Sequence, residues 1–329
     1  MAWVRRLLSV LLACLMLGAG GGYLGWWWAE RYLRSPGPLQ AGTVLILERG
    51  SGVSAIAAKL AEAGAVEHPR LFALLARATD RDHDLKAGEY ALTPGMSPQA
   101  ILDLLRSGKV VLHPIAVPEG LTVAEVYDLL TASDVLAGEL PTAPPEGTLL
   151  PETYLVPRGE PRPKLVERMH GAMQAELDAL WAQRRPDLAL RTPEEALILA
   201  SIIEKETALP EEYRLVAAVF QNRLRKGMKL QTDPTVIYGL TAGKGPLARE
   251  LTRADLEQDQ PYNTYRILGL PPGPIANPGR AALAAALDPA PVDYLYFVAN
   301  GEGGHAFAAT LAEHNRNVAR WRALQRTAP

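Results

Sequence analysis

The chain has 329 residues and a formal net charge of −2, so its charge gives no indication of a nucleic-acid partner. This length is enough for a membrane segment and two folded domains. The single cysteine, Cys14, excludes an internal disulfide.

The first predicted element is a membrane-spanning helix at residues 7–29. Leu7 to Ala29 carry no charge and follow two arginines. A helix rises about 1.5 Å per residue, so this run is long enough to cross the roughly 30 Å hydrocarbon core of a bilayer. Trp26, Trp27 and Trp28 are placed to form an aromatic belt at the membrane interface.

The two arginines before this run determine the expected orientation. The positive-inside rule keeps residues 1–6 in the cytoplasm and residues 30–329 outside, although Arg31 and Arg34 on the far side weaken the bias. A cleaved signal peptide and a lipoprotein modified at Cys14 are the two alternatives. Both are disfavoured because the apolar run is longer than a typical signal-peptide core and continues well past Cys14.

Residues 30–41, with their Ser35-Pro36-Gly37-Pro38 segment, are expected to form a linker. Residues 42–145 then contain a weak internal repeat. In each copy a glycine follows a short apolar run, with an aliphatic residue six positions later and a leucine four beyond that. The three sets are Gly50, Ile56, Leu60; Gly95, Ile101, Leu105; and Gly120, Val126, Leu130.

This spacing predicts a strand, a glycine turn and a helix whose inner face begins with the two aliphatic residues. The hydroxyls of Ser54, Ser97 and Thr122 are placed to cap or begin these helices. The proline-rich segment Pro141–Pro145 marks a boundary, after which residues 146–329 are expected to form a second domain.

A helix in the second domain carries the main catalytic candidate. Thr192 suits the N-cap, Pro193 the first helical position, and Glu195 completes a capping box. Leu199, Ile202, Ile203 and Glu206 then share one face, at i, i+3, i+4 and i+7.

Glu206 therefore continues an apolar stripe near the carboxyl end of this helix, whereas Glu204, two positions away, points elsewhere. Burial and the helix dipole both favour the neutral carboxyl, which is the form that a general acid needs. The alternative is a solvated glutamate or an ion pair with Lys205 or Arg214.

A second helix is predicted from Pro210 to about Lys226, and a polar cluster at residues 231–235 follows it and ends in a turn. Candidate groove residues can hydrogen-bond to sugars or stack on them, although Tyr262 and Tyr265 could equally be core residues and an Asp-Pro turn is usually structural. They are Gln231, Thr232, Asp233, Tyr238, Tyr262, Asn263, Thr264 and Tyr265. His305 is interpreted as structural. The six histidines show no metal-binding spacing, so no metal is expected, and no cofactor is expected either.

The motifs from Leu197 to about Asn317 resemble those of the endolytic murein transglycosylase family (MltG/YceG-like). They are EKETA at Glu204–Ala208, LQTDPTVIYG at Leu230–Gly239, LTRADLE at Leu251–Glu257, YNTY at Tyr262–Tyr265, GLPPGPIANPG at Gly269–Gly279 and YLYFVANGEGGHAF at Tyr294–Phe307. The family's catalytic glutamate falls on Glu206, which also aligns with the acid of goose-lysozyme-like transglycosylases. The family often has Asp where this chain has Glu152, which leaves the role of that acid open.

The resemblance implies an α+β protein of a bacterial cytoplasmic membrane. A transmembrane helix is followed by a LysM-like α/β module, within residues 42–145, and then by a catalytic domain related to lysozyme-like transglycosylases. The LysM-like module implies contact with glycan containing N-acetylglucosamine, although the region could be only a spacer and has few aromatic residues for stacking. Peptidoglycan strands are the implied substrate, and peptidoglycan synthases, including penicillin-binding proteins, are the implied partners.

The implied reaction is non-hydrolytic cleavage of MurNAc–GlcNAc bonds within nascent strands. Glu206 acts as the single acid and base, and the product ends in 1,6-anhydro-MurNAc. Three alternatives stay open: an inert wall-binding or division scaffold, a lyase with Lys205 as a Schiff base, and a hydrolase that uses water, for which Asp233 is the nearby second carboxylate.

Overall fold

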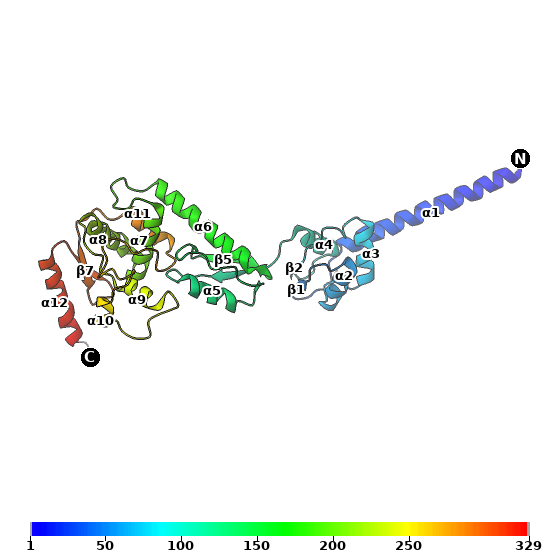
Figure 1. The fold of residues 1–329 in the computed structure, drawn as a ribbon. Coiled ribbons are helices and arrows are strands. Elements are labelled where there is room, and N and C mark those ends of the chain that lie inside the picture. The colour runs from blue at the N-terminus through cyan, green and yellow to red at the C-terminus, as the bar shows by residue number, and fades with distance from the viewer. Residues whose placement is uncertain (1, 328–329) are drawn as a thin grey trace. The chain divides into compact units, whose positions relative to one another are not determined.

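A computed structural model describes residues 2–327, and these residues form two compact units (Figure 1). The first unit runs to His113 and includes Val156–Gly159, while the second comprises Pro114–Leu155 and the chain from Glu160 onward. This division differs from the expected boundary at residues 145 and 146, because the third copy of the repeat belongs to the second unit.

The first unit contains α1 (Ala2–Arg34), β1 (Thr43–Leu47), α2 (Val53–Glu62), α3 (Pro69–Ala78), β2 (Gly88–Leu92) and α4 (Pro98–Ser107). Strands β1 and β2 pair antiparallel, from Thr43 opposite Leu92 to Leu47 opposite Gly88. The two helices between these strands bury Phe72 and Leu60 against the pair, so the segment from β1 to β2 has a strand–helix–helix–strand order with one core.

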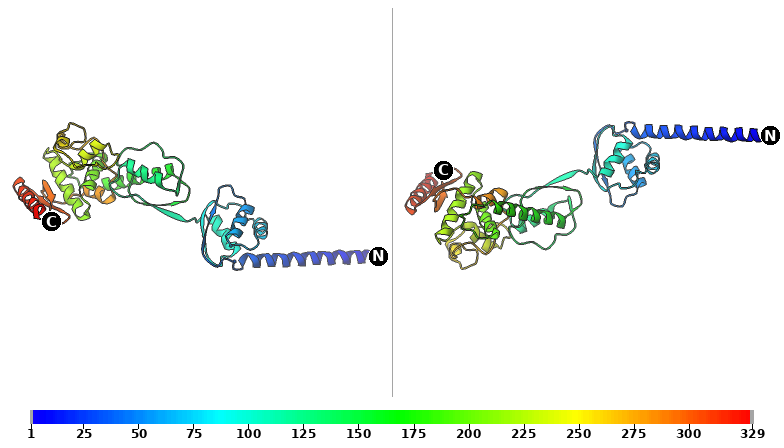
Figure 2. Two further views of the ribbon diagram at one scale, coloured as in Figure 1. Left: turned by 90° about the horizontal axis from the view of Figure 1, so that it is seen from below. Right: turned by 90° about the horizontal axis from the view of Figure 1, so that it is seen from above.

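Helix α1 projects from the first unit as one continuous helix (Figure 2). Its stretch Arg6–Arg34 contains an 18-residue window with a mean hydropathy of 2.0 and is long and apolar enough to cross a membrane, a test that an amino-terminal signal sequence would also pass. The expected linker after it is packed rather than free, because Leu33 and Leu39 are buried in the core of the unit. Gly37 lies so close to the carbonyl of Met96 that a Cβ would approach its oxygen to 2.4 Å.

The predicted repeat is present in all three copies. Gly50, Gly95 and Gly120 adopt φ values of 81°, 67° and 76°, the left-handed conformation that favours glycine. Each turn leads into a helix: α2, α4 and α5 (Val123–Ala132). The six aliphatic residues that were predicted to start the inner faces are all buried, none more than 2% exposed.

The capping prediction is correct at two of the three helices. Ser97 and Thr122 are the N-caps of α4 and α5 and accept backbone N–H groups. Ser54 lies in the first turn of α2 but does not cap it, because the N-cap position two residues after the glycine is Gly52 in the first copy. Ser54 lies inside α2, where its hydroxyl accepts from the Arg77 guanidinium at 2.8 Å.

The second unit is mainly helical. After α5 it contains β4 (Leu136–Ala137), β5 (Thr153–Pro157), β6 (Glu160–Pro161), α6 (Arg162–Ala182), α7 (Pro193–Glu206), α8 (Tyr213–Arg225), α9 (Asp233–Thr241), α10 (Arg253–Glu257), α11 (Arg280–Leu287), β7 (Tyr296–Ala299), β8 (His305–Ala308) and α12 (Leu311–Thr327). Strand β3 (Leu112–Ala116) pairs with β5, β4 pairs with β6 in parallel, and β7 pairs with β8 antiparallel.

Helix α7 is the centre of this unit and packs against α6, α8, α9 and α11 (Figure 1). Helix α6 directs an apolar side that includes Met169 and Met173 toward the core. Strand β7 begins at Tyr296, and all four of its residues are half-buried, so buried and exposed residues do not alternate along it.

Candidate active site

Helix α7 is fixed at its start by the predicted N-cap. The Thr192 hydroxyl accepts the Glu195 N–H at 3.2 Å, while the Glu195 carboxylate accepts the N–H of Arg191 at 2.6 Å, one residue before the expected partner. Ile202 and Ile203 are fully buried, so the register of the helix is set by the core. The helix ends at Glu206, because Thr207 has an extended backbone.

Glu206 lies half-buried at this helix end and accepts a hydrogen bond from the hydroxyl of Thr232. Burial raises the pKa of Glu206 to about 7, and the negative charge of Asp233 acts in the same direction. The Thr232 hydroxyl and the positive charges of His305 and Arg223 oppose this rise in the pKa. A carboxyl with a pKa near 7 can give up a proton and take one back at neutral pH, as a single acid and base must.

Thr232 is held in place by a buried cluster of threonines. Its N–H donates to the Thr264 hydroxyl at 3.0 Å, and its carbonyl accepts the Thr235 hydroxyl at 2.8 Å. The hydroxyls of Thr235 and Thr264 lie 2.9 Å apart. The Thr232 hydroxyl that donates to Glu206 is therefore positioned by hydrogen bonds between Thr232 and the two neighbouring threonines.

Glu204 has a structural role at the same helix end. Its Oε2 accepts the N–H of Gly279, the N-cap of α11, at 2.9 Å, and its Oε1 accepts the Tyr213 hydroxyl at 3.1 Å. Burial raises the pKa of Glu204, and the charge of nearby Glu119 adds to the effect. Glu204 therefore connects α7 to α11 and to the start of α8.

A pocket of about 390 Å³ surrounds the end of α7, and both acids border it. Its lining residues are Glu119, Gly120, Glu204, Lys205, Glu206, Thr207, Ala208 and Tyr213. Residues two apart on a helix point in nearly opposite directions, as predicted, yet the two side chains share one pocket because the helix stops there and the pocket wraps around its end.

A second pocket, of about 310 Å³, shares Lys205 with the first and has walls from α9 that include Ile237 and Tyr238. The Lys205 ammonium donates to the carbonyl of Gly120 at 3.0 Å, which connects α7 to the turn before α5. Among the described residues, the two hollows therefore share Lys205, and Glu206 lines the first of them.

The structure brings some of the predicted groove residues to exposed positions near Glu206. Gln231 and Asp233 are exposed, and Asp233 accepts the Tyr265 hydroxyl at 2.6 Å. Asp233 begins α9, so the Asp-Pro segment starts a helix and is not only a turn. Tyr238 and Tyr262 are half-buried with ring centroids 4.8 Å apart, and both pack against the core, the alternative considered for Tyr262.

Asn263 and Thr264 occupy different positions from those predicted, because both side chains are fully buried. The Asn263 amide donates to the carbonyls of Asp255, Leu256 and Gln258 and accepts the Tyr265 N–H. Its polar atoms are occupied in holding the loop after α10. These two predicted groove residues are therefore corrected to buried residues: Asn263 holds the loop after α10, and Thr264 belongs to the threonine cluster around Thr232.

Sequence reasoning missed a hydrogen-bonded pair, Glu212 and His305, next to the site. Glu212 accepts both the backbone N–H and the Nδ1 of His305 at 2.6 Å, as well as the Thr207 hydroxyl at 2.9 Å. Burial would raise the pKa of Glu212, but its bonds with His305 and Thr207 lower it overall. The pair fixes the β7–β8 hairpin to the turn after Glu206, so His305 makes a structural contact here.

Arg223 is a second missed residue. It is only 8% exposed, and its guanidinium donates to the carbonyls of Leu295 and Leu230 at 2.7 and 2.6 Å. It therefore holds the loop that leads to Thr232. No local sequence signal distinguishes such residues, because their partners lie far along the chain.

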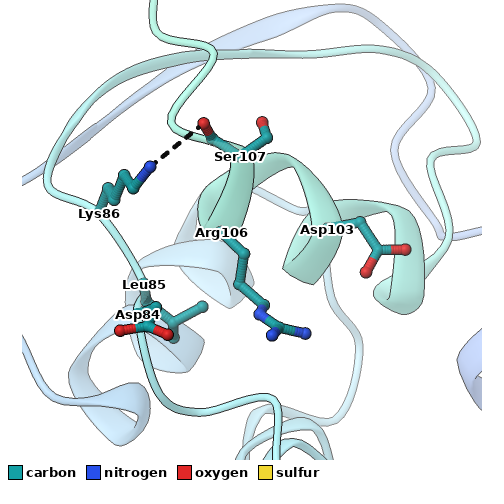
Figure 3. Close-up of a pocket in the computed structure, with 6 residues that line it drawn as sticks. All are labelled: Asp84, Leu85, Lys86, Asp103, Arg106 and Ser107. Atoms are coloured by element: carbon teal, nitrogen blue, oxygen red, sulfur yellow. Dashed lines mark hydrogen bonds between the residues drawn. The ribbon is translucent and has the colours of Figure 1, made fainter.

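The first unit has a hollow of its own, of about 570 Å³, between the loop before β2 and the end of α4 (Figure 3). It is lined by Asp84, Leu85, Lys86, Asp103, Arg106 and Ser107. None of these is aromatic, and the Lys86 ammonium donates to the Ser107 carbonyl at 3.4 Å. The hollow offers charged and polar groups but no ring for sugar stacking.

Comparisons with known proteins agree with these features. The sequence profile of the YceG-like family matches residues 45–320. The chain is 30% identical to the endolytic murein transglycosylase of Streptococcus pneumoniae serotype 2 over 96% of its own length, and it spans 65% of that protein. It is 34% identical to the endolytic murein transglycosylase of Bacillus subtilis strain 168, over 81% of each chain.

A solved structure is also similar. The crystal structure of a YceG-like protein from Listeria monocytogenes is 31% identical and superposes with a TM-score of 0.51, over 84% of this chain and 99% of that one. The profile match covers most of the chain, so the chain belongs to the YceG-like family.

Proposed function

We propose that the protein is an endolytic murein transglycosylase with Glu206 as its single catalytic acid and base. The observation that carries the proposal is the Glu206 carboxyl, whose pKa is raised to about 7 by burial and which lies in a pocket at the end of α7. The curated relatives with this name support the same activity.

The proposed reaction needs one carboxyl group and no water. Glu206 donates its proton to the glycosidic oxygen as the bond from that oxygen to C1 of MurNAc breaks. The resulting carboxylate then takes the proton of the C6 hydroxyl of the same MurNAc, and that oxygen bonds to C1. The 1,6-anhydro end forms and Glu206 returns to its protonated state, which requires a carboxyl whose pKa lies near the working pH.

The roles of the surrounding residues follow from this scheme. Thr232 positions the Glu206 carboxyl, and the exposed side chains of Gln231 and Asp233 and the half-buried Tyr238, Tyr262 and Tyr265 contribute to substrate binding. Asp233 also makes hydrolysis the nearest rival, since it is a second carboxylate close enough to raise the pKa of Glu206. Its bond from the Tyr265 hydroxyl favours a binding role instead.

The proposal includes the location of the protein in the cell. Helix α1 acts as a single-pass anchor in the bacterial cytoplasmic membrane, and both units lie outside the cytoplasm. The strand–helix–helix–strand segment from β1 to β2 acts as a LysM-like module whose glycan contact is weak, because the hollow in Figure 3 lacks aromatic rings. Peptidoglycan synthases are proposed partners on the family resemblance alone.

The test is mass analysis of the products from purified glycan strands, with Glu206→Gln beside the wild type. A transglycosylase gives fragments one water lighter than a hydrolase gives. Loss of general acid catalysis should lower the rate of Glu206→Gln on the order of 10²–10⁴-fold. The matched control is Glu194→Gln, the same change at an exposed position of the same helix, which should retain full activity. Hydrated ends would support a hydrolase, an undiminished rate in Glu206→Gln would contradict Glu206 as the catalytic acid, and no fragments from the wild type would support the inert scaffold.

A further inference from the structure

Helices α1 and α3 enclose an apolar crevice of about 190 Å³ at the amino-terminal side of the first unit. Helix α1 lines it with Gly22, Gly25, Trp26, Ala29, Glu30 and Leu33, and α3 lines it through Leu75, Ala78 and Thr79. In Figure 1, α3 lies beside α1, whereas β1 lies on the side of the unit away from the projecting part of α1. The folded unit therefore meets α1 within its uncharged run.

The position of this contact along α1 fixes its depth in a bilayer. A hydrocarbon core of about 30 Å holds roughly 20 helical residues, so counted from Leu7 the core ends near Trp27. Tilting the helix places more of its residues in the core, not fewer. Gly22 and Gly25 thus lie at the depth of the acyl chains, and the end of α3 that shares their crevice must reach the boundary of the lipid.

The surface of α3 has the chemistry that such a position requires. Leu74 is 60% exposed, and Ala78, one turn later on the same face, is exposed and lines the crevice. The helix contains no acidic residue, and its two arginines, Arg70 and Arg77, are exposed. An arginine with an apolar stem, such as Arg70, can extend from a lipid boundary to anionic head groups, whereas the Arg77 guanidinium is bonded to Ser54.

We propose that α3 is partly immersed in the membrane interface, with Leu74 and Ala78 against lipid acyl chains. The crevice between α1 and α3 is then filled by lipid. The contact holds the first unit flat against the bilayer, instead of leaving it suspended from a flexible stalk. This inference rests on the proposed membrane anchor, and it adds a lipid-binding surface to the folded module that follows the anchor.

The sole cysteine makes a direct test possible. The full-length protein carries an environment-sensitive fluorophore either at native Cys14 or, in a Cys14→Ser background, at Leu74→Cys or Ile46→Cys. Ile46 is a matched control, because it is an aliphatic residue that is 50% exposed on β1. Each labelled protein is reconstituted into phosphatidylethanolamine–phosphatidylglycerol vesicles with and without lipids that carry a quencher on the acyl chain.

The inference predicts that the label at Leu74 in vesicles emits at a shorter wavelength than the same dye free in buffer. The intensity of this label should fall when the vesicles contain quencher lipids. The label at Ile46 should show neither effect. A water-like emission at Leu74, with Cys14 quenched, would overturn the inference and leave the anchor intact. A label at Cys14 that is not quenched would instead contradict the anchor itself. Emission at short wavelength without lipid quenching would overturn the inference in favour of a second copy of α1 in the crevice.

Discussion

The hydrogen bond from Thr232 to Glu206 leads to a quantitative prediction for the variant Thr232→Val. Valine has nearly the shape of threonine but lacks the hydroxyl that stabilises the Glu206 carboxylate, so its loss raises the pKa of Glu206 above about 7. A hydrogen bond to a charged group contributes about 1.5–3 kcal/mol, and one pH unit corresponds to about 1.4 kcal/mol, so the expected shift is about 1 to 2 pH units.

The sign of the effect on activity follows from the role of Glu206 as an acid. Activity requires the protonated carboxyl and is lost as the pH rises through its pKa. The alkaline limb of kcat/KM should therefore move to higher pH in Thr232→Val. Well above neutral pH, the variant should retain a larger fraction of its maximal kcat/KM than the wild type retains.

The assay is the rate of anhydro-product formation on purified glycan strands across the neutral and alkaline range. The control is Thr235→Val, which removes another hydroxyl of the same cluster. The Thr235 hydroxyl forms hydrogen bonds with Thr232 and Thr264 but not with Glu206. It should lower stability without moving the limb. An alkaline limb that stays in place in Thr232→Val, or moves to lower pH, would refute the assignment of that limb to Glu206.

Three further predictions concern the scaffold around the site. Glu204→Gln leaves one of two buried donors unsatisfied and should lower the free energy of unfolding by about 1–3 kcal/mol, measured by urea denaturation; an unchanged midpoint would contradict its connecting role. Gly147→Ala should lower the free energy of unfolding by about 2–5 kcal/mol in the same measurement, because φ of Gly147 is 80° and a Cβ would lie 2.6 Å from the Pro274 ring. A variant as stable as the wild type would contradict this and show that the turn can relax. Glu212, whose pKa is lowered below its ordinary 4.5, stabilises the fold above that pH and loses the effect as the pH falls through its folded value. The difference in unfolding free energy between wild type and Glu212→Gln should therefore be largest near neutral pH and shrink in acid, and a difference independent of pH would contradict this.

The amino-acid sequence by itself determined the features that depend on neighbouring residues. The spacing of Leu199, Ile202 and Ile203 fixed which side of α7 is buried, and the capping signal at Thr192 fixed where the helix begins. Glycine spacing likewise gave the three strand–turn–helix units, since a left-handed turn and a helix period are local properties. An uncharged run identified α1 as a candidate membrane span.

Only the tertiary structure decided what surrounds Glu206. Its bond to Thr232 crosses 26 positions of the chain, and the bond that gives Glu204 a structural role crosses 75. No periodicity extends over such separations, because these contacts form where independently specified helices pack. For the same reason the structure, and not the residue pattern, showed that Asn263 is buried and that α3 meets α1 within the uncharged run.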